Sequence, residues 1–219
     1  MRHMSELPLA VVSSIATQRL REPGSLSIDL RRGQAVAAPD ARLQYCVQVV
    51  SGALRICRPL ADGRRQITGF LFPGDWAGLH EAREHHASIE AVSQSRVRLV
   101  LPHNLRSVPA ALHADPSAAI ESLFRERLQQ AQARILVLGH KNAREKLASF
   151  LLEASHRLAD GGDVIALPMP RADIADYLCL SAETVCRNFT QFVADGFIAL
   201  PHPQSVHILR RGPLEFLGL

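Results

Sequence analysis

The strongest constraint on the fold is residues 169–198, where two short helical patterns meet across a break of three residues. The first pattern starts at residue 170 or 171 and ends at 178, and the second starts at Ser181, a preferred N-cap residue, and ends before Gly196. The apolar residues of both patterns are spaced to face each other; they are Ile174, Leu178, Leu180, Val185 and Phe189. The segment predicts a helix-turn-helix.

The start of the second helix is expected to stay exposed, because the apolar face of that helix packs on the first. Offsets of three and four residues place Glu183, Cys186 and Arg187 on one side of it. Such a helix fits the major groove of DNA, where an arginine binds guanine O6 and N7 and a glutamate accepts from a cytosine amino group. Two short strand patterns, 197–200 and 205–209, predict a hairpin wing beside the helices.

Strand patterns dominate the earlier part of the chain, from Ile28 to about Leu112, where Gly, Pro and Asp separate short β-branched and aliphatic runs. The clearest runs are Tyr45–Val50, Ala53–Cys57, Gln66–Phe72, Ser88–Val92 and Val97–Leu101. Many short strands at this spacing predict a small antiparallel barrel or sandwich.

A long helix is expected between these two parts, because no Gly or Pro occurs between Pro116 and Gly139. Its apolar residues recur at steps of three and four; they are Ile120, Phe124, Leu128, Ala131, Ile135 and Leu138. This stripe suits the seam of a coiled-coil dimer, and it equally suits a helix that packs on its own barrel. A further helix is expected over 143–158.

Composition sets limits without naming a function. With 219 residues the chain is long enough for two domains, and it contains no apolar run long enough to cross a bilayer and no secretory h-region, so we expect it in the cytoplasm, away from membranes. The net charge is +4, but residues 141–219 hold 8 basic and 9 acidic groups, so bulk charge does not predict DNA binding. No nucleophile elbow, P-loop or dinucleotide fingerprint indicates an enzyme or a catalytic residue.

The helix-turn-helix carries a resemblance to a known family. Its sequence Arg171-Ala-Asp-Ile-Ala-Asp-Tyr-Leu-Cys-Leu-Ser-Ala-Glu-Thr-Val-Cys-Arg187 resembles the pattern R-x-D-I-A-x-Y-L-x-L-x-x-E-T-V-S-R of the CRP/FNR superfamily of bacterial regulators. The barrel segment from Gly52 to Trp76 is similar to the effector domain of that family. The resemblance covers nearly the whole chain.

The resemblance implies an α+β fold: an N-terminal antiparallel β-roll like that of cyclic-nucleotide-binding proteins, a long dimerisation helix and a C-terminal winged helix-turn-helix. The expected divisions are an arm (1–27), the β-roll (28–112), the dimerisation helix (113–140) and the DNA-binding domain (141–219). The implied function is a homodimeric transcription activator that binds double-stranded DNA and RNA polymerase. The implied operator is an inverted repeat of the type TTGAT-N4-ATCAA, and a repressor is the alternative.

The implied site lies on the recognition helix. In the FNR-like branch a glutamate, a serine and an arginine read the half-site, and these roles fall on Glu183, Cys186 and Arg187. Contacts with DNA are also expected from three neighbouring residues, which are Arg171, Ser181 and Thr184.

Departures from the family narrow the subtype. No cysteine precedes Cys46, so an FNR-type iron–sulfur cluster is not expected. Residues 78–81 and 85–88 lack the Gly-Glu and Arg-Ser/Thr pairs that hold a cyclic phosphate, which argues against cyclic AMP. What remains resembles the FixK branch, which acts in low-oxygen and nitrogen-oxide gene programmes, and we expect no metal or other cofactor. A nitric-oxide-sensing haem regulator is the alternative, with histidines such as His80, His85 and His86.

Cys186 stands where the family has serine, and two interpretations are open. An exposed thiol near the positive end of a helix is prone to oxidation, and a sulfinic acid would place negative charge against DNA. Alternatively, sulfur only replaces a small hydroxyl. Cys179, in the turn between the helices, is expected to be packed, and Cys46 and Cys57 are expected in the core.

Overall fold

The computed structural model describes residues 25–37, 45–78, 87–101, 116–158 and 163–218; for residues 116–124, 126 and 127 it describes the backbone alone. The chain divides into two units, Met1–Val108 and Pro109–Leu219.

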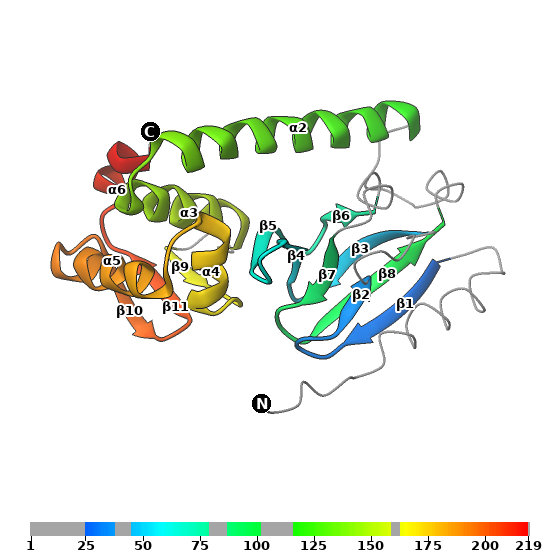
Figure 1. Cartoon of the computed structure of the whole chain (residues 1–219), viewed down its shortest axis with the longest axis horizontal. Coiled ribbons are helices and arrows are strands. Elements are labelled where there is room, and N and C mark those ends of the chain that lie inside the picture. The colour runs from blue at the N-terminus through cyan, green and yellow to red at the C-terminus, as the bar shows by residue number, and fades with distance from the viewer. Residues whose placement is uncertain (1–24, 38–44, 79–86, 102–115, 159–162, 219) are drawn as a thin grey trace. The chain divides into compact units, whose positions relative to one another are not determined.

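Two antiparallel sheets make up the described part of the N-terminal unit, and their strands are labelled in Figure 1. One sheet has the order β1-β8-β3-β6 and the other the order β2-β7-β4-β5. The strands are β1 (Ser25–Leu30), β2 (Ala35–Ala37), β3 (Cys46–Ser51), β4 (Leu54–Pro59), β5 (Arg65–Leu71), β6 (Trp76–Ala77), β7 (Ser88–Ala91) and β8 (Ser95–Val100).

The core of this unit lies between the sheets and follows from the alternation of side chains along each strand. Val47 and Val49 of β3 pack in one cluster with Leu54 and Ile56 of β4, and Ile89 of β7 joins them. Both cysteines expected in the core, Cys46 and Cys57, are buried.

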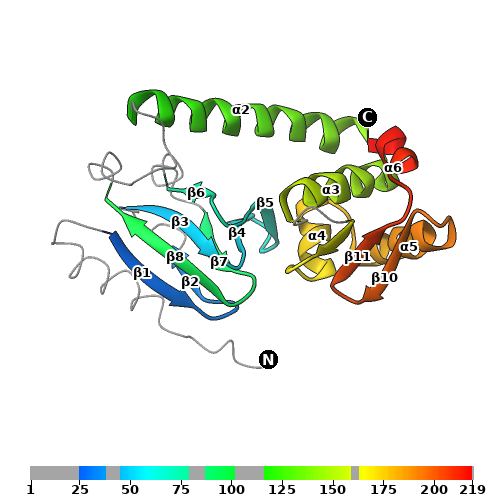
Figure 2. The same cartoon turned by 180° about the vertical axis from the view of Figure 1, so that it is seen from behind.

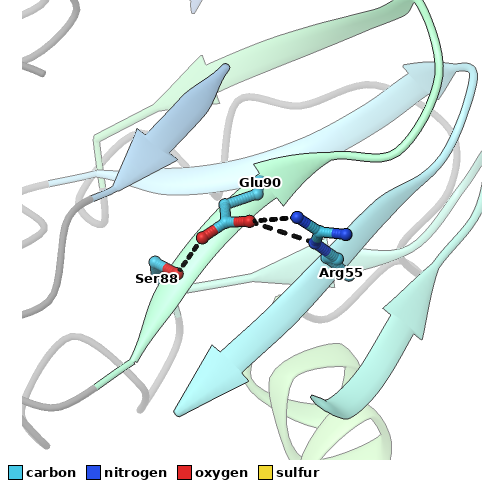
Figure 3. A network of polar contacts seen from close by, with 3 residues as sticks. All are labelled: Arg55, Ser88 and Glu90. Atoms are coloured by element: carbon cyan, nitrogen blue, oxygen red, sulfur yellow. Dashed lines mark hydrogen bonds and ion pairs between the residues drawn. The ribbon is translucent and has the colours of Figure 1, made fainter. Parts of the chain in front are cut away.

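The outer face of the second sheet carries a polar network (Figure 3). Arg55 and Glu90 are directly paired across β4 and β7. Arg55 donates to Glu90 Oε2 from Nε at 3.0 Å and from Nη2 at 2.7 Å, and Ser88 Oγ donates to Oε1 at 2.6 Å. Burial on its own raises the pKa of Glu90, but the hydrogen bonds from Ser88 and Arg55 outweigh it, so the pKa lies below its usual value. The ionised carboxylate therefore joins two neighbouring strands.

The C-terminal unit consists of helices around a small antiparallel sheet of order β10-β11-β9, seen from both sides in Figures 1 and 2. Its elements are α2 (Pro116–His140), α3 (Ala143–Leu158), β9 (Val164–Ala166), α4 (Arg171–Leu178), α5 (Ala182–Ala194), β10 (Ile198–His202), β11 (Ser205–Ile208) and α6 (Arg211–Gly218). Leu147, Leu151, Ile165 and Phe192 are fully buried side chains of its core.

The predicted α+β class, with its β-roll and winged helix-turn-helix, is confirmed. The runs singled out in the sequence do not include β1, β2, β6 and α6. β1 does alternate polar and apolar residues. β2 and β6 have three and two residues, too few for an alternating pattern, and α6 carries Gly212 and Pro213 in its first turn. Proline is tolerated there because the first N–H groups of a helix have no partner within it. In the sequence alone, however, a Gly-Pro pair predicts a turn.

The turn between β3 and β4 requires glycine. Gly52 has φ +82°, and a Cβ added there would lie 2.3 Å from Ser95 Oγ and 2.4 Å from the carbonyl oxygen of Gln94. Ser95 cannot move away freely, because its Oγ accepts from Ala53 N and donates to Ala53 O, both at 3.1 Å.

Gly52→Ala is therefore expected to lower the free energy of unfolding by about 2–4 kcal/mol, from positive-φ strain and overpacking together. Gly63→Ala is the matched control, because Gly63 has the same φ of +82° with nothing within 4 Å of an added Cβ. Chemical denaturation of both variants separates the two contributions. Equal losses in the two would show that the contact with Ser95 costs nothing.

Candidate nucleic-acid interface

The helix pair α4–α5 packs through apolar side chains. Ile174 and Leu178 of α4 and Val185 and Phe189 of α5 are each at most 2% exposed, as the spacing predicts. Leu180, in the turn between the helices, is only half-buried. One face of α5 is therefore buried against α4, and the opposite face has to point away from α4.

The exposed face of α5 carries the predicted base-reading residues. Glu183, Cys186 and Arg187 are all exposed, and Thr190 extends the same row by one turn. Within the described part of the chain, the side chains of Glu183 and Arg187 form no hydrogen bond or ion pair, and both are exposed, so their polar ends face outward. Thr190 was missed by the sequence analysis, although its offset of three from Arg187 signals the shared face.

The N-terminus of α5 is capped as the sequence predicts. Ser181 has extended backbone angles, and its Oγ accepts a hydrogen bond from Thr184 N at 3.1 Å. The two hydroxyl groups also share a hydrogen bond of 2.9 Å. Ser181 is exposed and Thr184 half-buried, at the end of the helix where the backbone dipole favours an anion.

Arg171 joins three elements of the unit. It is the first residue of α4, its Cζ lies 3.4 Å from the centroid of the Phe189 ring on α5, and its Nη2 donates to the carbonyl oxygen of Pro203 in the wing at 3.1 Å. Burial is the larger cause and lowers the pKa of this guanidinium, while a smaller electrostatic interaction with Cys186 acts in the opposite direction. Arg171 therefore holds the wing against the recognition helix while it remains half-buried.

The C-terminal end of α5 is held by a second arginine. Arg144 of α3 forms an ion pair with Asp195, and its Cζ lies 5.0 Å from the centroid of Phe192 and 5.5 Å from that of Phe197. The hydrogen bond from Arg144 lowers the pKa of Asp195. Both ends of the recognition helix are thus anchored, which presents its exposed face at a defined angle.

The wing is the hairpin of β10 and β11, in which Ile198 pairs with Ile208. Its tip, residues 200–204, is exposed, whereas Val206 of β11 is fully buried. An exposed hairpin beside an exposed helix can follow the sugar-phosphate backbone next to the groove that the helix enters.

Two cysteines of this region are exposed. Cys186 is exposed as expected, but the expectation that Cys179 is packed is wrong. Cys179 is the C-cap of α4 with φ 54°, a left-handed conformation that turns the chain out of the helix. It therefore lies at the outside of the turn instead of between the helices.

No group of three or more potential metal ligands occurs among the described residues. Residues 79–86, which include His80, His85 and His86, lie outside the described part, so the expectations about haem and cyclic nucleotides stay predictions. No described helix is both long and apolar enough to span a membrane.

A helix pair with an exposed second helix and a hairpin wing, following a β-roll, defines the class of winged helix-turn-helix regulators. Comparison with family models agrees: residues 145–217 match the Crp-like helix-turn-helix domain and residues 27–108 the cyclic nucleotide-binding domain.

The comparisons with individual proteins are more specific. The chain is 36% identical to the nitrogen fixation regulation protein FixK of Azorhizobium caulinodans, over 97% of this chain and 84% of that protein. It is 29% identical to the transcriptional activator protein FnrL of Cereibacter sphaeroides, over 80% of this chain and 73% of that protein. The structure of FixK2 from Bradyrhizobium japonicum matches with a TM-score of 0.81 and 35% identity, over 90% of this chain and 98% of that one.

The chain belongs to the CRP/FNR superfamily of DNA-binding transcription activators, in its FixK-like branch. Because its relatives are transcription regulators, the prediction that it is not an enzyme is confirmed.

Proposed function

We propose that this chain works as a homodimer that reads an inverted repeat of the type TTGAT-N4-ATCAA and activates transcription through RNA polymerase. The observation that carries the proposal is the pair Glu183 and Arg187, which are exposed one helical turn apart on a helix whose other face is buried. A regulator that binds bacterial DNA acts in the cytoplasm. A role in low-oxygen or nitrogen-oxide gene control is proposed from the resemblance to the FixK branch, and the FixK relative of Azorhizobium caulinodans is a nitrogen fixation regulation protein.

Each residue of the exposed face has a proposed partner. Arg187 donates two hydrogen bonds to guanine O6 and N7, and Glu183 accepts one from a cytosine amino group. Cys186, between them, contacts a thymine methyl in its reduced form. The capped N-terminus of α5, with Ser181 and Thr184, lies against a phosphate, and Arg171 offers the N–H groups that Pro203 does not use.

Arg187→Ala is expected to weaken binding to the inverted repeat by about 1–3 kcal/mol and to relax the preference for one guanine in each half-site. Fluorescence anisotropy at fixed salt, on duplexes that vary this base pair, measures both effects. Arg210→Ala is the control for the loss of one positive charge from the same unit, because Arg210 is exposed outside α5. A loss in Arg187→Ala that is uniform across all base pairs would contradict base reading.

The dimer is proposed to form along α2. Leu128 and Ile135 are 60% and 69% exposed, Ala131 is exposed, and Leu138 is half-buried. Large apolar side chains in a row on a helix surface are favourable only when a partner covers them. Ile120 and Phe124, also predicted for this row, lie in the part of α2 whose side chains the structure does not describe. Leu136, 60% exposed beside the predicted row, was not anticipated and widens the apolar surface.

Ile135→Asp is expected to convert the dimer into a monomer, because it places a charge in an apolar seam. Sedimentation equilibrium measures the mass directly. Ala133→Asp provides the matched control, since Ala133 is exposed on the opposite side of the same helix. Both variants introduce the same residue, aspartate, into the helix. A dimeric Ile135→Asp protein would place the interface elsewhere.

Oxidation of Cys186 is proposed to switch binding off. Each hydrogen peroxide molecule transfers one oxygen atom to sulfur and leaves as water, so two of them convert the thiol to a sulfinic acid. The product is anionic and lies between Glu183 and Arg187, where it would repel the phosphates and bases of the operator. The exposed position of Cys186 near the N-terminus of α5 supports this proposal.

Peroxide treatment is expected to weaken operator binding of the wild type at least about tenfold, and to leave the Cys186→Ser protein largely unaffected. Cys179→Ser is the informative control, because Cys179 is the other exposed cysteine of this unit; it should respond like the wild type. Gel shifts before and after treatment provide the measurement. Equal inhibition of Cys186→Ser and wild type would exclude Cys186 as the switch.

A further inference from the structure

The side chain of Arg134 on α2 reaches the first helix of the helix-turn-helix. Arg134 Nη2 donates to the carbonyl oxygen of Tyr177 at 2.8 Å, and the Cζ of Arg134 lies 3.8 Å from the centroid of the Tyr177 ring. The arginine therefore uses its edge for a hydrogen bond and its flat face for a cation–π contact with the same residue. The two residues are 43 positions apart in the chain, so this contact belongs to the tertiary structure.

Tyr177 is itself firmly held. Its ring packs edge-on against Phe150 of α3, with centroids 5.9 Å apart and an interplanar angle of 61°. Burial is the largest cause that raises the pKa of Tyr177 to about 12, so the phenol stays neutral. Tyr177 lies in the last turn of α4, where carbonyl groups attract a cation, and the turn that follows leads directly into α5. A contact made with Tyr177 therefore acts on a residue that lies close to the start of the recognition helix.

The connection between α2 and α3 is short, and the chain is not helical there. Only Lys141 and Asn142 separate α2 from α3. Asn142 caps the new helix: its Oδ1 accepts from Arg144 N at 2.9 Å and from Glu145 N at 3.1 Å, and Glu145 Oε2 accepts from Asn142 N at 2.9 Å. This capping box starts a separate helix instead of continuing α2. A helix attached at one such break can swing about it, and a second attachment fixes its direction.

We propose that the contact of Arg134 with Tyr177 is this second attachment, and that it sets the spacing between half-sites that the dimer accepts. The inference rests on the proposed function. Arg134 adjoins Ile135, so the proposed dimer seam and this contact lie next to each other on α2. The angle between α2 and α4 then determines how far apart the two recognition helices of a dimer lie. Arg134 is a positioning residue, which does not itself touch a base.

The physical consequence is that the dimer discriminates between operators whose spacers differ in length. Adding one base pair moves a half-site by about 3.4 Å and turns it by about 35° around the DNA axis. A dimer with fixed recognition helices has to reject such a site, or bend the DNA at a cost in free energy. A dimer whose recognition helices can change their orientation binds both spacings with similar affinity, because each helix can adjust to the position of its half-site.

The test is binding of Arg134→Met to duplexes whose spacer has three, four or five base pairs, and to a duplex with one half-site. The wild type is expected to prefer the four-base-pair spacer by about tenfold or more. In Arg134→Met this preference should fall to within about threefold, while affinity for the single half-site stays unchanged. Arg134→Lys keeps the charge and the donor but not the flat face, and should give an intermediate preference. Arg125→Met removes an exposed arginine from the same helix and should bind like the wild type.

Circular dichroism and sedimentation equilibrium confirm that each variant is folded and dimeric. An unchanged spacing preference in Arg134→Met overturns the inference and leaves the proposed base reading intact. So does a monomeric Arg134→Met protein, because the residue would then act through dimerisation. A wild type that shows no preference for the inverted repeat over unrelated DNA overturns the proposed function, and this inference with it.

Discussion

The packing of α5 on α4 is the interaction on which the rest of the C-terminal unit depends. Four apolar side chains, at most 2% exposed, fix which side of α5 faces inward. Each buried residue of this size contributes about 1.5–3 kcal/mol, so rotation of the helix about its axis is strongly opposed. The hydrophobic effect has no direction of its own, but helix periodicity converts it into one: with Val185 and Phe189 inside, Glu183 and Arg187 have to be outside.

Arginines then connect the elements that surround the helix pair. Arg171, Arg144 and Arg134 each place the guanidinium within 5.0 Å of an aromatic ring centroid and direct a hydrogen bond to a carbonyl or carboxylate oxygen. A lysine would lose the flat face and the fork that allow both contacts at once. These residues share a consequence: the wing, the end of the recognition helix and the long helix α2 are each held at a defined angle to the helix-turn-helix.

This arrangement explains how a unit with almost balanced charge serves DNA recognition. Residues 141–219 have one more acidic than basic group, so the net charge of this part of the chain gives little attraction to DNA. What matters is where the few outward groups stand, and the structure places a carboxylate, a thiol and a guanidinium in one row. Such a surface depends on geometry more than on bulk electrostatics, which gives the angles set by the arginines their importance.

Local patterns in the chain were sufficient for much of this description. Helix periodicity, the N-cap at Ser181 and the apolar spacing from Ile174 to Phe189 lie within a few residues of each other, and they predicted α4, α5 and the exposed face correctly. Contacts between distant residues left no such trace. Arg134 and Tyr177 are 43 positions apart, and the fork of Arg171 meets a carbonyl 32 positions away. The exposure of Cys179 depends on a left-handed cap that cysteine seldom adopts. These features follow from how whole elements pack, because one spacing pattern is compatible with several packings and only the folded chain selects among them.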